Sequence, residues 1–387
     1  MQNSLTLERL PTRAQLAEWL AATGLDEAMD TVMAAYDSGT LATPANFATL
    51  RTCHQKAWLD GTRLTPEDLA GCTLDRMLLA KILMALLVPL LRARHQSLGL
   101  PESVTAESCR GLGNSVRVRL EFPDDLWRSL HWTGKYHREI MFKTGLFEYL
   151  VEKMSEKLPV WAFRSRMDNS VVALAGDGVR VDEFGLVCAD EAPPAFITHF
   201  ERTADTIAGH WVAPNGRITR ECLTLPAADW ETILGPGMVS AGIHIPSGRP
   251  MYLADCGASL RAAADVIRDC LASQGIKCFA CLSWILNPEW LELLPDSNMA
   301  QFMREVYLFP IKSSPTAGID FVFHQPAAEL DLKTAPRKSR LQRIMLERLE
   351  QNKPLHAGGM FLPLEDVKHF GSQYFVRRAA GAQMPDS

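Results

Sequence analysis

The sequence predicts an α+β protein with α/β-like alternation, in which a helical N-terminal region precedes a mixed sheet flanked by helices. Three observations support this fold class. Apolar residues recur at helical spacing over about the first 165 residues. Short β-type runs separated by Gly, Asp and Asn-Gly follow, and strands then alternate with helices. We expect a helical domain at residues 1–165, a sheet domain at 166–372 and a disordered tail at 373–387.

The composition is that of a globular protein that folds in water. Of the 387 residues, 47% are apolar and 22% are charged, so a large core can form without disulfides or metals. The formal charge of −5 argues against nucleic acid or a membrane surface as a partner, since both favour basic proteins. The nine cysteines are scattered, and the first residues lack a leader-like apolar segment. We therefore expect free thiols, no metal and a cytoplasmic location.

Two segments carry the strongest helical signals of the N-terminal region. Arg76–His95 is the most apolar, but its apolar core is too short for a membrane span and contains Lys81 and Pro89. We predict a buried core helix there. The segment 126–159 predicts a further helix that ends at Pro159. Its apolar face is expected to consist of Phe147, Leu150, Val151, Met154 and Leu158.

The second half of the chain alternates between strand and helix patterns. Asn215-Gly216 predicts a hairpin turn between strands at Ala208–Ala213 and Arg217–Leu225. The later predicted strands are Val239–Ile245, Met251–Ala254, Cys278–Leu286, Ile319–His324 and Leu355–Leu362. The predicted helices between them are 259–272, 298–308 and 340–351. This alternation predicts a layered arrangement with a binding crevice near the strand ends.

Four segments carry a family resemblance: SAGIHIPSG, ADCGASLRAAADVI, CFACLSWILNPEWLELLPDSNMAQFMREVYLFP and SRLQRIMLERLEQNKPLHAGGMFLPL. They resemble the acyltransferase family that joins a helical N-terminal domain to a GNAT-like C-terminal domain, GNAT being the fold of acetyl-CoA-dependent N-acetyltransferases. The resemblance is densest from Thr203 to Leu364 and extends back, more weakly, through 147–165. Its most specific parts are Ser283–Pro288 and the later Ser297-Asn298. The Arg/Gln-x-x-Gly-x-Gly/Ala phosphate loop of GNAT enzymes is missing, and ADCGASLRA stands in its place.

His244 is the candidate general base. Strand alternation places Ser240, Gly242 and His244 on one face, and the aliphatic residues between them on the other. With the aliphatic face in the core, His244 would lie on a small, open face. An unperturbed histidine pKa of about 6.5 suits proton removal from an amine nucleophile. The alternative is a structural or surface histidine.

The candidate cofactor-binding segment consists of Gly257, Ala258 and Ser259. Ser259 is predicted to cap the helix that follows, and the two small residues before it leave room for a phosphate at the helix start. The alternative is an ordinary cap packed against the sheet. Cys256, beside this helix start, could act as a nucleophile if its pKa were lowered, but no histidine partner is identifiable from spacing.

Two further candidates come from the resemblance. It implies that Asn298 contacts the cofactor arm and that Tyr307 acts as a general acid. From the residues alone, Asn298 and Gln301 have the spacing of a capping box, and Tyr307 is an aromatic packing residue. The basic segment 337–343 reads as a solvated helix face or as a contact to a cofactor phosphate.

The resemblance implies acyl transfer from acetyl-CoA, another acyl-CoA or a carrier-bound thioester to an amine or hydroxyl of a small-molecule acceptor. We expect this substrate to lie between the two domains. The alternative is a non-catalytic ligand-binding or regulatory module on a GNAT-like fold that has lost its phosphate loop. A thiol or serine hydrolase is a third possibility with only isolated residues behind it, because no Gly-x-Ser-x-Gly, His-Glu-x-x-His or Walker motif occurs.

Overall fold

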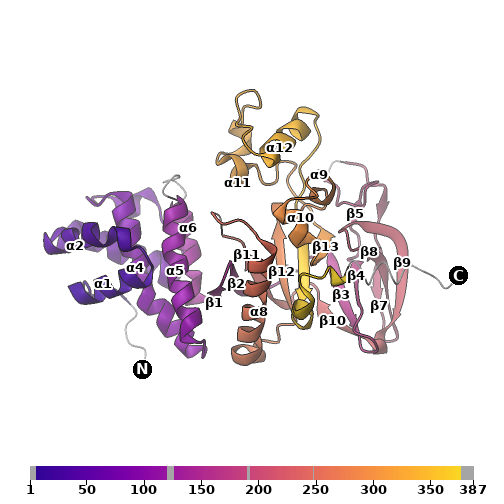
Figure 1. The fold of residues 1–387 in the computed structure, drawn as a ribbon, viewed down its shortest axis with the longest axis horizontal. Coiled ribbons are helices and arrows are strands. Elements are labelled where there is room, and N and C mark those ends of the chain that lie inside the picture. Colours follow the sequence, from indigo (N-terminus) through magenta and orange to yellow (C-terminus); the bar gives the residue numbers. More distant parts are fainter. Residues whose placement is uncertain (1–5, 120–125, 190–191, 247, 376–387) are drawn as a thin grey trace. The chain divides into compact units, whose positions relative to one another are not determined.

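The computed structural model describes residues 6–119, 126–189, 192–246 and 248–375 (Figure 1). The chain forms two compact units. The helical unit comprises the chain up to Val151, together with His244–Arg249 and Asp265–Ala272. The sheet unit comprises Glu152–Ile243, Pro250–Ala264 and the chain from Ser273 onward. Each unit is described by itself below.

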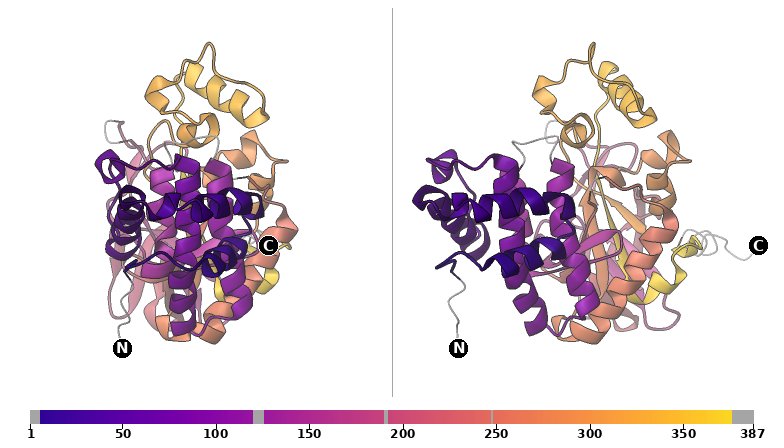
Figure 2. Two further views of the ribbon diagram at one scale, coloured as in Figure 1. Left: turned by 90° about the vertical axis from the view of Figure 1, so that its left-hand side faces the viewer. Right: turned by 60° about the vertical axis from the view of Figure 1, so that its left-hand side comes forward.

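The helical unit is built around one apolar helix, and Figures 1 and 2 show its helices, coloured indigo to purple, gathered into a bundle. Its helices are α1 (Arg13–Ala22), α2 (Met29–Asp37), α3 (Pro44–Cys53), α4 (Arg76–Ser97), α5 (Glu102–Arg119), α6 (Leu126–Thr133) and α7 (Lys135–Arg138). The prediction of a buried helix at Arg76–His95 is confirmed by α4, which Asp75 caps by accepting bonds from the N–H groups of Met77 and Leu78. In the part of the chain that the structure describes, no helix is both long and apolar enough to span a bilayer.

The predicted helix over 126–159 is wrong. The short helices α6 and α7 occupy its start, and a hairpin of β1 (Ile140–Thr144) and β2 (Phe147–Lys153) follows, with Gly145 in the left-handed region at φ 58°. The first four residues of β2 are all buried. A strand covered on both faces shows a continuous apolar run, and such a run is not distinguishable from a buried helix by periodicity.

The described part of the sheet unit contains two larger groups of paired strands and one two-stranded sheet. In one of the larger groups the strand order is β10-β3-β4-β8-β7, with β9 paired to β8. These strands are β3 (Val160–Ser165), β4 (Val171–Ala175), β7 (Phe200–Arg202), β8 (Thr206–Val212), β9 (Ile218–Pro226) and β10 (Trp230–Leu234), and β5 (Arg180–Val181) pairs separately with β6 (Phe196–Ile197). The antiparallel pair β8–β9 confirms the hairpin predicted from Asn215-Gly216, with Gly216 at φ 81°.

The second group of strands carries the candidate site. Its order is β11-β12-β14-β13, with β11 (Val239–His244) parallel to β12 (Cys278–Ser283) and the pairs of β12 with β14 (Gly358–Pro363) and of β13 (Tyr307–Pro310) with β14 antiparallel. The sheet is therefore mixed, as predicted. The helices of this part are α8 (Leu253–Cys270), α9 (Trp290–Leu293), α10 (Asn298–Met303), α11 (Ile319–Phe323) and α12 (Arg340–Glu350). The views agree that α11 and α12, drawn in gold, extend beyond the ends of these strands (Figure 2).

Two local predictions in the second half of the chain are wrong. The strand predicted at Met251–Ala254 and the helix predicted at 259–272 are one helix, α8, which begins at Leu253. The strand predicted at Ile319–His324 is the short helix α11, in which Ile319 and Phe323, four residues apart, are both buried. Within the segment predicted as a tail from residue 373, Phe375 is buried against Tyr307. Residues 376–387 of that predicted tail lie outside the described residues.

Candidate active site

The parallel strands β11 and β12 pair over only two residues each. The partners are Ala241 with Phe279 and Gly242 with Ala280, after which β12 continues along β14 as far as Ser283. β11 therefore reaches its last residue, His244, beyond the point where it pairs with β12. In α/β folds, ligands bind at the carboxyl ends of parallel strands, where neighbouring strands separate.

The face of β11 that carries His244 is not open, contrary to the prediction. Ser240 and Gly242 are both buried, and the Ser240 hydroxyl lies 3.0 Å from Met154 Sδ. The aliphatic residues on the other face are buried as well. A strand beside a parallel neighbour is commonly covered on both faces, so its alternation does not report which face is solvated.

His244 belongs to the helical unit and is half-buried against Trp132 of α6. The two ring centroids are 4.4 Å apart with the ring planes at 64°, an edge-to-face contact. Burial, together with the positive charge of Lys135, lowers the pKa of His244 to about 4. The Nε2 atom is buried and has no hydrogen-bond partner among the described residues. With this pKa, His244 is a neutral imidazole at pH 7, and one of its ring nitrogens is left without a protein partner among the described residues.

Trp132 is itself held by a buried carboxylate. Its indole N–H donates to Oε2 of Glu148, on β2, across 3.1 Å, and Glu148 is only 6% exposed. The ammonium group of Lys135 lies 5.4 Å from the centroid of the Trp132 ring and forms an ion pair with Glu139. Neither Trp132 nor Glu148 was identified from the sequence, and both fall in the segment 126–159 that was predicted to be helical.

Two more titratable groups surround Glu148. Burial lowers the pKa of Lys143, whose ammonium group donates to the Leu146 carbonyl across 3.0 Å. Burial and the Glu148 carboxylate raise the pKa of Tyr136 well above its usual value. These side chains fit under α5 because residue 111 is glycine: a Cβ there would lie 3.0 Å from Lys143 Cδ and 3.4 Å from the Tyr136 hydroxyl.

The predicted phosphate site at Gly257, Ala258 and Ser259 rests on a helix start that the structure places elsewhere. The Cys256 N–H donates to the Tyr252 carbonyl, so Tyr252 holds the N-cap position and Ser259 does not. Residues 257–259 are in the second turn of α8, where backbone N–H groups bond within the helix. The space that a side chain at Gly257 would need is taken by Phe370, whose Cδ1 would lie 3.0 Å from a Cβ there.

Cys256 lacks the properties of a nucleophile. Its side chain is buried, and burial, with a smaller effect from Asp255, raises the pKa of the thiol to about 12. A reactive cysteine instead needs a lowered pKa and access to substrate.

Capping by Asn298, the alternative to its cofactor-binding role, is wrong, whereas Tyr307 makes the packing contact expected of a structural residue. Ser297, not Asn298, caps α10, since its hydroxyl accepts from the Ala300 N–H at 3.1 Å. The Tyr307 ring stacks on Phe361 with centroids 4.8 Å apart.

Tyr307 is also far from the end of β11. It shares a row with Gly242, because Gly242 pairs with Ala280, Ala280 with Phe361, and Phe361 with Tyr307. Three strand spacings separate the ends of that row, roughly 14 Å. The sheet does not bring Tyr307 to the same place as the β11 end.

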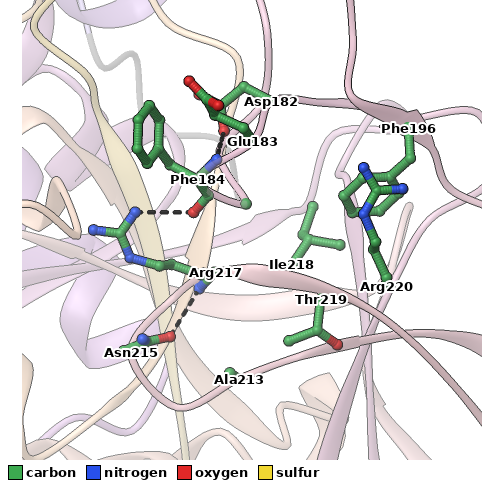
Figure 3. A pocket seen from close by; sticks show the side chains of 11 residues that line it. Asp182, Glu183, Phe184, Phe196, Ala213, Asn215, Arg217, Ile218, Thr219 and Arg220 are labelled. Carbon is green, nitrogen blue, oxygen red and sulfur yellow. Dashed lines mark hydrogen bonds between the residues drawn. The ribbon is translucent and has the colours of Figure 1, made fainter.

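The sheet unit also contains a cavity of about 370 Å³ beside the β8–β9 hairpin (Figure 3). On one side, Arg217 donates to the Phe184 carbonyl across 2.9 Å and forms an ion pair with Glu292. On the other side, the Arg220 guanidinium lies 4.7 Å from the centroid of the Phe196 ring. None of the predicted site residues lines this cavity.

The described ranges contain no cluster of side chains suited to bind a metal ion. No group of three or more His, Cys, Asp and Glu side chains with the geometry to hold a metal ion occurs in that part of the chain.

The fold and the β11 end define a chain of the GNAT-like type. The family model described as "GNAT-like C-terminal domain" matches residues 142–361, more than half of the chain, and the protein belongs to this family. No curated protein matches the sequence.

Solved structures with the same fold are acyltransferases. A mutant acyltransferase in complex with octanoyl-CoA has a TM-score of 0.57 at 17% identity, covering 92% of this chain and 89% of that one. An acyltransferase in complex with decanoyl-CoA and teicoplanin has a TM-score of 0.56 at 16% identity, covering 92% and 90%. An acyltransferase in complex with CoA and 10C-teicoplanin has 0.57 at 17%, with the same coverage.

Proposed function

We propose that this protein is an acyltransferase that moves an acyl group from acyl-CoA to an amine or hydroxyl of a small-molecule acceptor. The observation that carries the proposal is the end of β11 in a chain of the GNAT-like family. There, a parallel strand extends past the residues at which it pairs with its neighbour, and it ends in a neutral histidine whose buried Nε2 has no partner among the described residues. The structurally similar acyltransferases, which bind octanoyl-CoA, decanoyl-CoA and teicoplanin, support the same donor and a small-molecule acceptor.

His244 accepts the proton that the acceptor loses as its nitrogen or oxygen attacks the thioester carbonyl. The new C–N or C–O bond forms, the C–S bond breaks, and CoA leaves as a thiolate that takes up a proton. A thiol with a pKa of about 8.5 is a good leaving group at neutral pH, so the reaction does not require Tyr307 as an acid. The packing of Tyr307 on Phe361 supports a structural role instead.

We place the donor phosphates at the first turn of α8 rather than at residues 257–259. The first N–H groups of a helix have no acceptor within it, and α8 has 18 residues whose dipoles favour an anion at that end. Gly248, at φ 92°, and the cation Arg249 shortly precede this turn in the sequence. Tyr252, at the N-cap, is 57% exposed.

One observation favours the alternative of a non-catalytic ligand-binding module. The glycine-rich phosphate loop is missing from the sequence, and the first turn of α8 carries the acid Asp255. A module would bind its ligand without releasing thiol. Calorimetric titration with acetyl-CoA, octanoyl-CoA and decanoyl-CoA, followed by a thiol-release assay with a primary amine and with teicoplanin, separates the two functions. Saturable binding with acceptor-dependent thiol release supports the enzyme, and binding without release supports the module.

Two matched variants test where the phosphates bind. Ala254 and Ala258 are both exposed on α8 and lie one turn apart. Ala254→Glu adds a negative charge in the first turn and should weaken acyl-CoA binding about tenfold, an effect typical of one nearby charge. Ala258→Glu should bind acyl-CoA as the wild type does. Equal affinities of the two variants in calorimetry would move the phosphates away from this helix end.

A further inference from the structure

We propose that Trp132, anchored by Glu148, is the positioning residue that fixes the orientation of the His244 ring and shields it from water. This inference deepens the proposed function, since it assigns two further residues to the same site. It concerns contacts within the helical unit alone: α6 supplies Trp132, β2 supplies Glu148, and His244 belongs to the same unit.

The orientation of the His244 ring depends on its contacts with neighbouring side chains. A catalytic imidazole is usually held by a hydrogen bond to one ring nitrogen while the other works. Nε2 of His244 has no such bond among the described residues. The ring instead meets the Trp132 indole in an edge-to-face contact, with centroids 4.4 Å apart. The orientation of the imidazole therefore depends on where the indole is held.

Trp132 is in turn held by a hydrogen bond to a buried carboxylate. Its N–H donates to the Glu148 carboxylate, and a charge-assisted bond of this kind is stronger than one between neutral groups. Glu148 in turn sits on the rigid β1–β2 hairpin, opposite Lys143 in the register. A carboxylate that is only 6% exposed is costly to bury without partners, so its bond to Trp132 is part of what makes this burial tolerable.

The contact with Trp132 also affects the pKa of His244. Burial is the main cause of the low pKa of His244, and the positive charge of Lys135 contributes. The charged groups facing this site are Lys135 with its partner Glu139, Glu148 with the neighbouring Lys143, and Arg249 on the segment after β11. Removing the indole admits water and should raise the pKa of His244 toward the unperturbed value of about 6.5.

The test is an NMR titration of labelled histidines in the full-length protein, with the His244 signal assigned from its loss in His244→Ala. In the wild type we expect this signal to titrate near pH 4. In Trp132→Ala the midpoint should move up by at least one pH unit. Trp132→Phe keeps the apolar contact but loses the N–H bond, so its midpoint should stay low while the ring signal broadens or shifts.

Trp161→Phe is the matched control, because Trp161 is also a half-buried tryptophan in an aromatic contact, 5.4 Å from the centroid of Phe200 in the sheet unit. It should leave the His244 titration unchanged. Glu148→Gln keeps an oxygen acceptor and should shift the signal less than Trp132→Ala does. If His244 titrates alike in the wild type, Trp132→Ala and Trp132→Phe, with no change in its ring signal, the positioning role is refuted.

Kinetics separate this inference from the proposed function. Misplacing a reacting group by about 1 Å can cost roughly 10²-fold in rate, so Trp132→Phe should lower kcat by 10-fold or more with little change in KM. If the wild type shows no acyl transfer but Trp132→Ala shifts the titration, the proposed function fails and the positioning role stands. If His244 is essential for transfer but neither Trp132 variant alters kcat or the pH profile, the positioning role fails and the proposed function stands.

Discussion

His95 and His244, both in the helical unit, have similarly lowered pKa values but differ in their hydrogen-bond partners. The pKa values of His95 and His244 are both lowered to about 4, mainly by burial. His95 has partners at both ring nitrogens, Thr105 Oγ1 at 3.1 Å and the Met141 carbonyl at 3.0 Å, whereas Nε2 of His244 has none among the described residues. The pKa of His54 is likewise lowered to about 4, and its Nδ1 is also buried without a partner among the described residues. A low pKa and an unpartnered nitrogen therefore both follow from burial, and what sets His244 apart from His54 is its place at the end of β11.

The largest expected effect follows from this difference. His244→Ala should lower acyl-transfer turnover by about 10²–10⁴-fold, the usual contribution of a general base, with acyl-CoA affinity nearly intact. The measurement is steady-state thiol release together with calorimetry of acyl-CoA binding. His210→Ala is the control, since His210 is a half-buried histidine of β8 bonded to the Thr219 carbonyl. Full turnover in His244→Ala would make His244 a structural residue like His95.

Replacing His95 should lower the stability of the fold, whereas replacing His244 should lower turnover. His95→Phe keeps a ring of similar size but leaves the Thr105 hydroxyl and the Met141 carbonyl without their imidazole partner. The Thr105 hydroxyl keeps its bond to the Pro101 carbonyl, so the variant loses two hydrogen bonds without leaving both groups unpaired. The expected cost is about 1–3 kcal/mol in the free energy of unfolding. Urea denaturation at pH 7.5 checks this value. A loss below about 0.5 kcal/mol would mean that the two hydrogen bonds contribute little to the fold.

The same residues predict how stability depends on pH. Burial is the main reason that the pKa values of His54, His95 and His244 are each lowered to about 4, so in the unfolded chain they bind protons at higher pH than in the folded one. Their contribution to stability is therefore complete above about pH 6.5 and is lost as the pH falls toward 4. Melting temperatures measured from pH 7.5 to 4.5 should fall steadily. The stability gap between the wild type and His95→Phe should narrow over this range, and a constant gap would contradict the assignment.

The sequence predicts the mixed sheet, the apolar helix α4 and the Asn215-Gly216 hairpin because each has a strong local signal. It misplaces the start of α8 because Ser259 resembles a helix cap, whereas the residue at the N-cap, Tyr252, is not a capping type. The space beside Gly257 is occupied by Phe370, which lies more than a hundred residues away in the sequence. The residues around Gly257 therefore cannot show that this space is filled.

The site around His244 also depends on contacts between residues that lie far apart in the sequence. The strand that carries His244 and its position near the end of that strand are readable from alternation. Its contact with Trp132 joins residues 112 positions apart, and the anchor Glu148 lies on a strand that periodicity assigns to a helix. No motif spacing encodes contacts of this kind, because they arise from packing between elements and not within one.

The smallest expected effect is also the most direct test of the comparison between the two histidines. His244→Leu replaces an unpartnered buried polar ring with an apolar side chain, so it removes a desolvation cost and retains contact with Trp132. Functional sites often sacrifice stability in this way, and the variant should unfold at the same urea concentration as the wild type or be more stable by up to about 1 kcal/mol. His95→Leu should be destabilised in the same assay, because its two partners lose their bonds. Equal losses for the two leucine variants would show that Nε2 of His244 is satisfied in solution, and the argument that it is reserved for a substrate would fail.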